Sequence, residues 1–299
     1  MTTFAIAALQ LELDHGDNID AIGEEVRLVK QRFPWIDMVI VGELAAYGPK
    51  LDYAQPLPGP AESRFAEIAR QTGVWVIPGS LYEATGGRVF NTTPVINPDG
   101  DVIARYRKMY PFLPYEQNVA AGEQCVVFDV PGKGRFGLSI CYDMWFPETT
   151  RTLAWMGAEV ILHPVMTNTI DRDVELAMAR SSAATNQCYV FDVNVAGRLG
   201  VGRSLIAGPG GEVLHQSGTE REVIPIEVDF DYVRRVRERG WHGLGQVLKS
   251  FRDAAHTFAP YAQGAASAAL NRLGPLNKPD PSDQGGSLDA PPTRKKWGD

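Results

Sequence analysis

Residues 135–148, RFGLSICYDMWFPE, join a short apolar run to a segment with helix-start signals. The apolar run 136–140 has few polar groups to hydrate, and it predicts a strand buried on at least one face. Pro147 is tolerated in a first helical turn, and Glu148 favours the positive end of a helix that begins there. We therefore expect Cys141 at the carboxyl end of a buried strand, facing a turn.

Strands and helices alternate on both sides of this stretch. The hydrophobic pattern predicts strands over residues 3–13, 38–45, 74–83, 136–141, 159–164, 188–195 and 222–230. Helices are expected from Asp17 or Asn18 to about Phe33, and over residues 61–73, 147–157 and 171–187. Turn signals at 97–100, 132–134 and 208–211 predict hairpins, so antiparallel pairs should join the sheet. The pattern favours an α/β domain over residues 1–232, with mixed sheets and outer helices.

Composition and charge argue against several classes of function. The 299 residues are 44% hydrophobic and carry a net charge of −7, which offers no basic surface to nucleic acid. Apolar stretches are far shorter than the roughly 20 residues that span a bilayer. The start, MTTFAIAALQLELDHG, lacks the basic region of a secretory leader. We therefore expect a cytoplasmic protein that binds neither nucleic acid nor membrane.

Cysteine and histidine spacing argues against cross-links and metals. The three cysteines are an odd number without a CxxC pair, which is typical of reduced thiols rather than of a disulfide framework. The five histidines are scattered, with no HxH or HExxH spacing. The sequence therefore predicts no metal site.

Beyond residue 232 the composition changes. Residues 233–270 combine a basic helical stretch with an Ala-rich run, which we interpret as an arm appended to the domain. Residues 271–299 contain five prolines among Gly, Ser and Asp, so they bury too little apolar surface to offset the entropy of ordering. We expect a disordered tail there.

Polar side chains at strand ends and in one loop are candidates for chemistry. Glu43 follows an apolar run, so it is either a solvated strand end or a base that points into a site. Lys108 and Glu116 stand eight residues apart in a Pro-containing loop, where charged residues are usually solvated. Cys141 is either a reactive thiol, whose pKa a strand-to-helix turn would lower, or a small buried apolar residue. Taken singly, these residues leave both interpretations open.

Taken together, they resemble a known triad. Glu43 in GEL, Lys108 in YRKMYPFLPYE and Cys141 in SICYDMWFPE are similar to the Glu-Lys-Cys triad of the nitrilase superfamily of carbon–nitrogen hydrolases. The resemblance continues through AEVILHP, ARSSAATNQCYVFDVNVAG and GRSLIAGPGGEVL and covers about residues 3–230. It implies a four-layer αββα sandwich with mixed sheets and a C-terminal extension. It also implies a homodimer or higher homo-oligomer, with residues 233–270 as a subunit contact.

The resemblance also implies roles for single residues. Cys141 would attack an amide carbonyl to form a thioester, with Glu43 as the acid and base. Lys108 and the backbone N–H of Tyr142 would hold the developing oxyanion. Glu116 resembles the second glutamate of the family's amidases, which orients the substrate and the lysine. This chemistry consumes a small amide and water and needs no cofactor.

The substrate itself is less closely defined by the sequence. True nitrilases tend to have Trp-Glu after the cysteine, whereas this chain has Tyr142-Asp143, which favours amides. Apolar residues near the motifs could line the substrate pocket: Tyr47, Phe112, Trp145, Phe146 and Met166. A carbamoyl amino acid would need an arginine for its carboxylate, and Arg172 and Arg203 are candidates.

Other functions remain open at this point. An N-carbamoyl amine or amino acid hydrolase is the first alternative, and a nitrilase is the second. A non-catalytic scaffold on the same fold is a third. His163 and Asn168, just after a predicted strand, could reach the site, although a structural role is the simpler interpretation.

Overall fold

The computed structural model of the chain describes residues 2–255 and 257–278. Contacts divide these residues into two compact units, the first made of residues 2–111 and 118–255, the second of residues 112–117 and 257–278. The first unit contains both large sheets and the six described α-helices.

The first sheet has seven strands: β1 (Thr3–Gln10), β3 (Met38–Val41), β4 (Trp75–Ile77), β5 (Leu81–Thr85), β6 (Arg88–Ile96), β7 (Val102–Arg107) and β15 (Glu222–Asp229). Their order is β15-β1-β3-β4-β6-β5, with β7 paired to β6. Strands β1, β3 and β4 are parallel neighbours, whereas β15, β5, β6 and β7 make antiparallel pairs. The sheet is therefore mixed, as the sequence predicts.

The second sheet has six strands: β8 (Val126–Val130), β9 (Gly134–Leu138), β10 (Val160–Val165), β11 (Tyr189–Asn194), β13 (Leu205–Ala207) and β14 (Val213–Gln216). Their order is β14-β13-β11-β10-β9-β8, and β9, β10 and β11 are parallel. Two short strands, β2 (Glu12–Leu13) and β12 (Ala196–Gly197), pair with each other. Parallel strands in both sheets end in loops, which is where functional side chains of α/β proteins usually lie.

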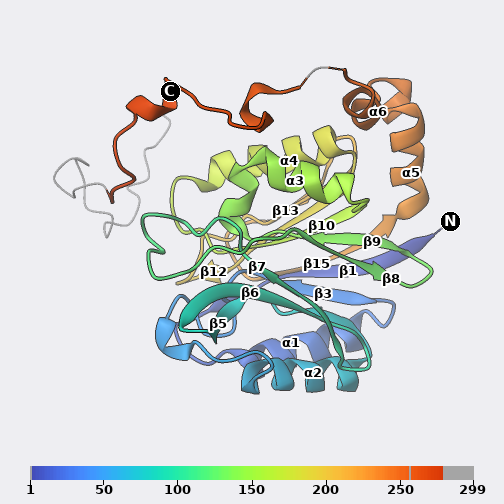
Figure 1. The fold of residues 1–299 in the computed structure, drawn as a ribbon. Coiled ribbons are helices and arrows are strands. Elements are labelled where there is room, and N and C mark those ends of the chain that lie inside the picture. The colour runs from blue at the N-terminus through green and yellow to red at the C-terminus, as the bar shows by residue number, and fades with distance from the viewer. Residues whose placement is uncertain (1, 256, 279–299) are drawn as a thin grey trace, which may run out of the picture. The chain divides into compact units, whose positions relative to one another are not determined.

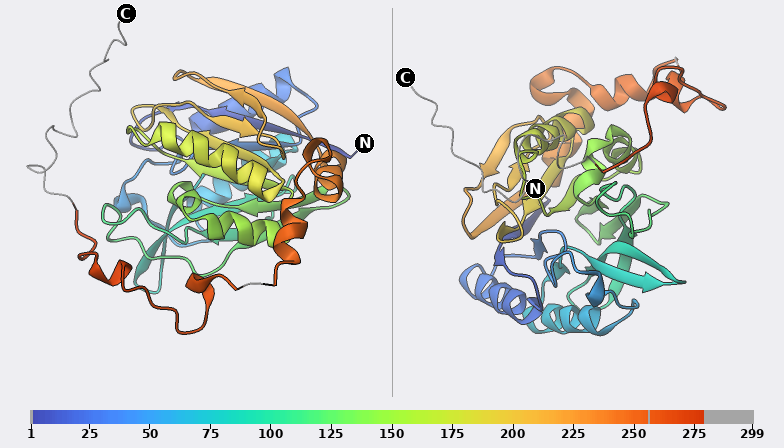
Figure 2. Two further views of the ribbon diagram at one scale, coloured as in Figure 1. Left: turned by 90° about the horizontal axis from the view of Figure 1, so that it is seen from above. Right: turned by 90° about the vertical axis from the view of Figure 1, so that its left-hand side faces the viewer.

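Helices cover the outer faces of the two sheets (Figures 1 and 2). Their bounds are α1 (Ile19–Arg32), α2 (Pro60–Thr72), α3 (Pro147–Trp155), α4 (Arg172–Asn186), α5 (Phe230–Arg239) and α6 (Val247–Arg252). Helices α1 and α2 lie on the first sheet, and α3 and α4 lie on the second. The order helix, sheet, sheet, helix is the predicted αββα sandwich.

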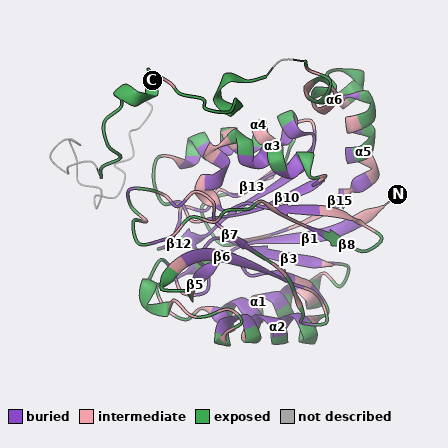
Figure 3. Cartoon of the chain, in the orientation of Figure 1, coloured by how far each residue is buried: buried purple, intermediate pink, exposed green. Residues whose placement is uncertain are grey.

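Alternation along the strands explains the layers. In β1, Ala5 and Leu9 face the helical layer, whereas Phe4 and Ile6 join the core between the sheets. A strand with period two that is apolar on both faces must be covered on both faces. Figure 3 shows the strands buried and the helices buried only on their inner sides. The hydrophobic cores thus lie between all adjacent layers.

Most predicted elements are confirmed, but three predicted strands are shorter or divided. The strand predicted over 3–13 is split into β1 and β2, and the one predicted over 38–45 ends at Val41. The predicted helix over 61–73 is α2, which ends with Gly73 in the left-handed conformation. The hairpins at 97–100 and 132–134 join β6 to β7 and β8 to β9. The single strand predicted over 74–83 is wrong, because the chain turns between β4 and β5. Gly79 lies at this turn with φ +77°, a conformation that interrupts an extended strand.

The predicted arm is divided between the two units. Helix α5 packs Val233 and Val236 into the first unit, and the chain remains part of that unit to residue 255. The second unit has short 3₁₀ turns at η4 (Ala259–Tyr261) and η5 (Leu270–Arg272). Of the predicted tail, residues 279–299 lie outside the described residues. The subunit contact predicted for the arm stays a prediction. Within the described residues, no helix has the length and apolarity that a bilayer span requires.

Candidate active site

Glu43 lies where the two sheets approach each other. It follows β3 after Gly42, and its backbone N–H donates a hydrogen bond of 3.0 Å to the carbonyl of Val165 at the end of β10. A Cβ atom on Gly42 would lie 2.6 Å from Cγ1 of Val195 and 2.9 Å from that Val165 oxygen. Only glycine allows this close approach. The packing of the sheets therefore fixes the position of the glutamate.

Lys108 and Asn91 both bind the carboxylate of Glu43. Nζ of Lys108 and Nδ2 of Asn91 each lie 2.8 Å from Oε1 of Glu43. The backbone N–H of Lys108 also donates to the carbonyl of Asn91, which places the lysine beside β6. The side chains of Lys108 and Glu43 are 1% and 3% exposed, so the ion pair is almost fully buried. A buried ion pair is found both at functional sites and in structural networks, so this pair marks Glu43 and Lys108 as candidates.

Cys141 begins a short 3₁₀ helix, η2 (Cys141–Trp145), and Ser139 and Ile140 separate it from the end of β9 at Leu138. Its φ of +45° lies in the left-handed region, which residues other than glycine rarely adopt. Such backbone strain is found where the surrounding structure fixes a functional side chain. The prediction that Cys141 stands between a buried strand and a turn is confirmed.

The charges of the buried ion pair act on the thiol of Cys141. Desolvation of the thiol is the largest effect and raises its pKa well above the usual value, and the Glu43 carboxylate raises it further. The Lys108 ammonium and the backbone of Met166 lower it. All three predicted triad residues are thus brought together. The expectation of a lowered pKa is wrong, because burial outweighs the favourable charges.

Asp143 links the turn that carries the cysteine to the segment that carries the lysine. Its Oδ2 accepts hydrogen bonds from the hydroxyl of Tyr106, at 2.6 Å, and from the backbone N–H of Ile140, at 2.8 Å. Its Oδ1 accepts a bond of 2.9 Å from the N–H of Tyr110. Burial raises the pKa of Asp143 to about 6, against the opposing effect of these hydrogen bonds.

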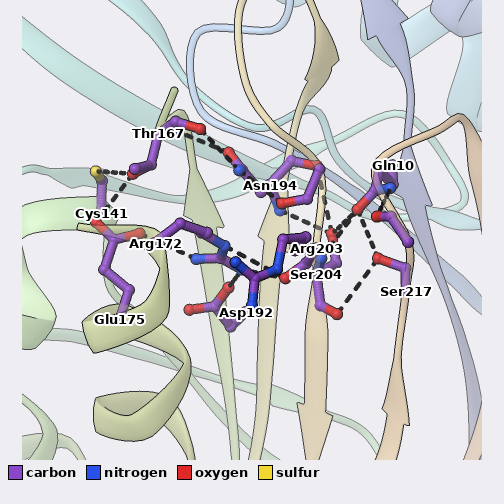
Figure 4. Close-up of polar contacts among 12 residues, drawn as sticks. Gln10, Cys141, Thr167, Arg172, Glu175, Asp192, Asn194, Arg203, Ser204 and Ser217 are labelled. Atoms are coloured by element: carbon purple, nitrogen blue, oxygen red, sulfur yellow. Dashed lines mark hydrogen bonds and ion pairs between the residues drawn. The ribbon is translucent and has the colours of Figure 1, made fainter. Parts of the chain in front are cut away.

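A series of polar contacts connects the sulfur of Cys141 to Thr167, Glu175 and Arg172 (Figure 4). Sγ of Cys141 lies 4.0 Å from Oγ1 of Thr167, and this hydroxyl donates a bond of 2.9 Å to Glu175. Nη1 of Arg172 lies 3.1 Å from the same carboxylate, and its Nη2 pairs with Asp192. Arg172 is 1% exposed and held by two carboxylates. The hypothesis that Arg172 binds a substrate carboxylate is therefore wrong, because its buried guanidinium already pairs with Glu175 and Asp192.

Aromatic rings follow the cysteine. Phe146 stacks on Tyr110 with ring centroids 3.6 Å apart, and Tyr142 contacts Phe146 edge-on at 5.4 Å. Trp145 lies 5.9 Å from the ring of Tyr142. Trp145 and Phe146, both predicted as pocket residues, are partly exposed in this group. Their contact with substrate stays a prediction.

The remaining predicted residues are distributed over both units. Tyr47 stacks on Tyr53 at 4.7 Å, and Met166 packs against the core beneath the first sheet. Phe112 and Glu116 belong to the second unit, where the N–H of Phe112 donates a bond of 2.5 Å to Oε2 of Glu116. The predicted contact of Glu116 with substrate and lysine stays a prediction.

His163 is a buried structural residue. Its Nδ1 lies 2.9 Å from the hydroxyl of Ser139, and burial, together with the charges of Arg172 and Lys108, lowers its pKa to about 3. The ring is therefore neutral at pH 7. Asn168 is exposed on the loop after β10. Within residues 2–255 and 257–278, no three His, Cys, Asp or Glu side chains gather in a way that could hold a metal ion.

Sequence reasoning missed several residues that contact the triad or its neighbours. Asn91 lies in β6 beside two other polar residues, Thr92 and Thr93, so it gave no signal of its own. Asp143 was used only to separate amides from nitriles, and its burial is visible only in the structure. Thr167 and Glu175 gave no signal, because polar residues in a loop and in a first helical turn are usually solvated.

Comparison with known proteins defines the class. A family model described as carbon-nitrogen hydrolase matches residues 5–238. The omega-amidase NIT2 of Homo sapiens is 28% identical over 258 residues, which cover 80% of this chain and 93% of the relative. The chain therefore belongs to the carbon-nitrogen hydrolase family, within the nitrilase superfamily, and is a hydrolase that acts on non-peptide C–N bonds.

Solved structures share the fold. Nit3 of Saccharomyces cerevisiae, a member of branch 10 of the nitrilase superfamily, matches with a TM-score of 0.73 and 25% identity over 79% of this chain and 94% of that one. A carbon-nitrogen hydrolase of Helicobacter pylori matches with a TM-score of 0.74 and 21% identity over 85% of this chain and 96% of that one. The second likeness concerns the fold alone.

Proposed function

We propose that the protein hydrolyses a carboxylic amide to the acid and ammonia through a thioester on Cys141. The observation that carries this proposal is the buried contact between Lys108 and Glu43, whose opposite charges both act on the cysteine thiol. The similarity to omega-amidases supports an amide rather than a nitrile as the substrate. Tyr142-Asp143, in place of Trp-Glu after the cysteine, supports the same choice.

The raised pKa of Cys141 determines how the first step begins. At pH 7 the thiol keeps its proton, so a standing thiolate is not the starting species. Glu43 takes the proton as the sulfur attacks the amide carbonyl, and a C–S bond forms. The Lys108 ammonium and the backbone N–H of Tyr142 stabilise the oxyanion. The C–N bond then breaks, and the nitrogen leaves as ammonia with the proton from Glu43.

The second half of the reaction uses the same base. Glu43 takes a proton from water, and the hydroxide attacks the thioester carbonyl. The C–S bond breaks, the carboxylic acid leaves, and the sulfur of Cys141 regains its proton from Glu43. Asn91 and Lys108 hold the carboxylate in place through both steps. Glu116 is proposed to orient the substrate amide and the lysine.

A panel of substrates tests the reaction class. Ammonia release is measured for aliphatic amides, aryl amides, carbamoyl compounds and nitriles with the wild type, Cys141→Ala and Cys188→Ala. Cys188 is a fully buried cysteine in another part of the core, so its variant controls for loss of a thiol. We expect amides to be hydrolysed by the wild type and by Cys188→Ala only. Equal activity of the wild type and Cys141→Ala would show that Cys141 is not the nucleophile.

The panel also separates the alternative functions. Release from carbamoyl compounds alone would favour the carbamoyl hydrolase, and turnover of nitriles alone would favour a nitrilase. No turnover of any compound would favour the scaffold. Two further predictions stay open: a homodimer or higher homo-oligomer, and a cytoplasmic location. Light scattering of the purified protein measures its molar mass and so tests the first.

A further inference from the structure

We infer that Glu175 makes this site select against amides whose acyl group carries a carboxylate, in favour of neutral or positively charged acyl groups. This inference rests on the proposed function, because it concerns the substrate of the same cysteine. Glu175 stands in the first turn of α4, and nothing in the resemblance to the family gives it a role.

Along the path through Thr167, the first charge met from the sulfur outward is negative. Thr167 touches the Cys141 sulfur at 4.0 Å and Glu175 at 2.9 Å, and the Arg172 guanidinium follows only beyond this carboxylate (Figure 4). Both partners of Glu175 are donors, a hydroxyl and a guanidinium, which suits an ionised carboxylate. Burial and the Asp192 carboxylate raise the pKa of Glu175, whereas these two donors lower it. The Glu175 charge reaches the reacting atom, since it is one of the causes that raise the pKa of the Cys141 thiol.

No arginine of this network is available for a substrate carboxylate. Arg172 donates to Glu175, to Asp192 and to the backbone carbonyl of Arg203, and it is almost completely buried. The side chain of Arg203 pairs with Asp173 at 2.6 Å. A carboxylate near the sulfur would therefore meet Glu175 with both arginines of this network already paired, and with the Lys108 ammonium already paired with Glu43, in a site where water screens charges poorly.

Glu175 could instead serve only to hold Arg172 and Thr167 in place. The two roles differ in what they predict for substrate charge. If the carboxylate of Glu175 is purely structural, its replacement lowers kcat/KM of all amides by the same factor. If it selects by charge, its replacement changes the ratio of kcat/KM between charged and neutral amides. The ratio of kcat/KM values is therefore the decisive measurement.

The wild type provides the first test without any substitution. Succinamic acid and succinamide form a pair in which a carboxylate replaces a neutral amide, and 3-aminopropanamide and butanamide form a pair in which an ammonium replaces a methyl group. We expect kcat/KM for succinamic acid to be at least about tenfold below that for succinamide, from the Coulomb repulsion of two like charges at reduced dielectric. We expect 3-aminopropanamide to match or exceed butanamide.

Substitution provides the second test. Glu175→Gln keeps the size of the side chain and removes its charge, and Asp129→Asn does the same at an exposed position outside this network. We expect Glu175→Gln to narrow the gap in kcat/KM between succinamide and succinamic acid by about tenfold, and Asp129→Asn to leave this gap unchanged. Hydrolysis of succinamic acid as fast as succinamide by the wild type would overturn the inference alone. Failure to hydrolyse any amide would overturn the proposed function and, with it, this inference.

Discussion

The phenolic oxygen of Tyr106 lies 2.6 Å from Oδ2 of Asp143, and this hydrogen bond ties the strand before the lysine to the turn after the cysteine. The same carboxylate binds the N–H groups of Ile140 and Tyr110. One buried side chain therefore positions two segments that are distant in sequence. Positioning of this kind sets the geometry on which the reaction depends, and a shift of about 1 Å can cost about a hundredfold in rate.

Replacing Asp143 by Asn should reduce kcat by about a hundredfold, because the new amide N–H₂ would face groups that donate. In the wild type, kcat should fall as the pH is lowered through about 6, since burial raises the pKa of Asp143 to about 6 and its protonation removes an acceptor. The variant should lack this transition. Asp129→Asn, at an exposed carboxylate, is the control. An unchanged pH profile of kcat in Asp143→Asn would contradict the assignment.

Replacing Glu43 by Gln should lower kcat by at least about a hundredfold, since glutamine cannot take the thiol proton. The variant keeps the size of the side chain and an oxygen that can face Lys108. Glu62→Gln is a matched control, because Glu62 is another buried carboxylate that pairs with a cation, Arg105, on the outer side of the first sheet. The measurement is the steady-state kcat of the wild type and of both variants with the same amide. Similar losses in both variants would indicate a general effect on folding.

Replacing Asn91 by Leu should move the acid limb of kcat/KM to higher pH. The side-chain N–H₂ of Asn91 donates to Oε1 of Glu43, and a hydrogen bond to the charged form of an acid favours that form. Its loss raises the proton affinity of the base. The measurement is the pH dependence of kcat/KM for both proteins. An acid limb at the same pH in the variant would show that this contact does not tune the base.

Replacing His163 by Gln should reduce the loss of stability in mild acid. Burial lowers the pKa of His163 to about 3, so below pH 6.5 only the unfolded chain takes up the proton. This contribution to stability is present above pH 6.5 and is lost as the pH falls. Between pH 7 and pH 5 the wild type should lose about 2 kcal/mol more unfolding free energy than the variant. Urea unfolding at both pH values measures this difference, with His15→Gln, at an exposed position, as the control.

The sequence predicted most of the fold because its signals are local. A continuous apolar run marks β1, and Gly73 marks the end of α2. The strand predicted over 74–83 failed because the turn at Gly79 interrupts an otherwise apolar run. Periodicity detects which residues are buried, but it does not show where the chain turns within a buried segment.

The candidate site was predictable only in part. Glu43, Lys108 and Cys141 form a recognisable pattern, and the structure brings them together. The contacts of Asn91 and Glu175 depend on how β6 and α4 pack against strands distant in sequence, which no local pattern encodes. The raised pKa of the thiol was missed for the same reason, because desolvation depends on the tertiary packing around the sulfur.

The most direct test of the central claim is the mass of the protein during turnover. The wild type and Cys141→Ala are mixed briefly with an amide that the wild type hydrolyses, quenched in acid, and examined by intact-mass measurement and peptide mapping. We predict that the wild type gains the mass of the acyl group, located on Cys141, and that the variant gains none. An acyl group on another residue, or the same mass gain in Cys141→Ala, would contradict the account.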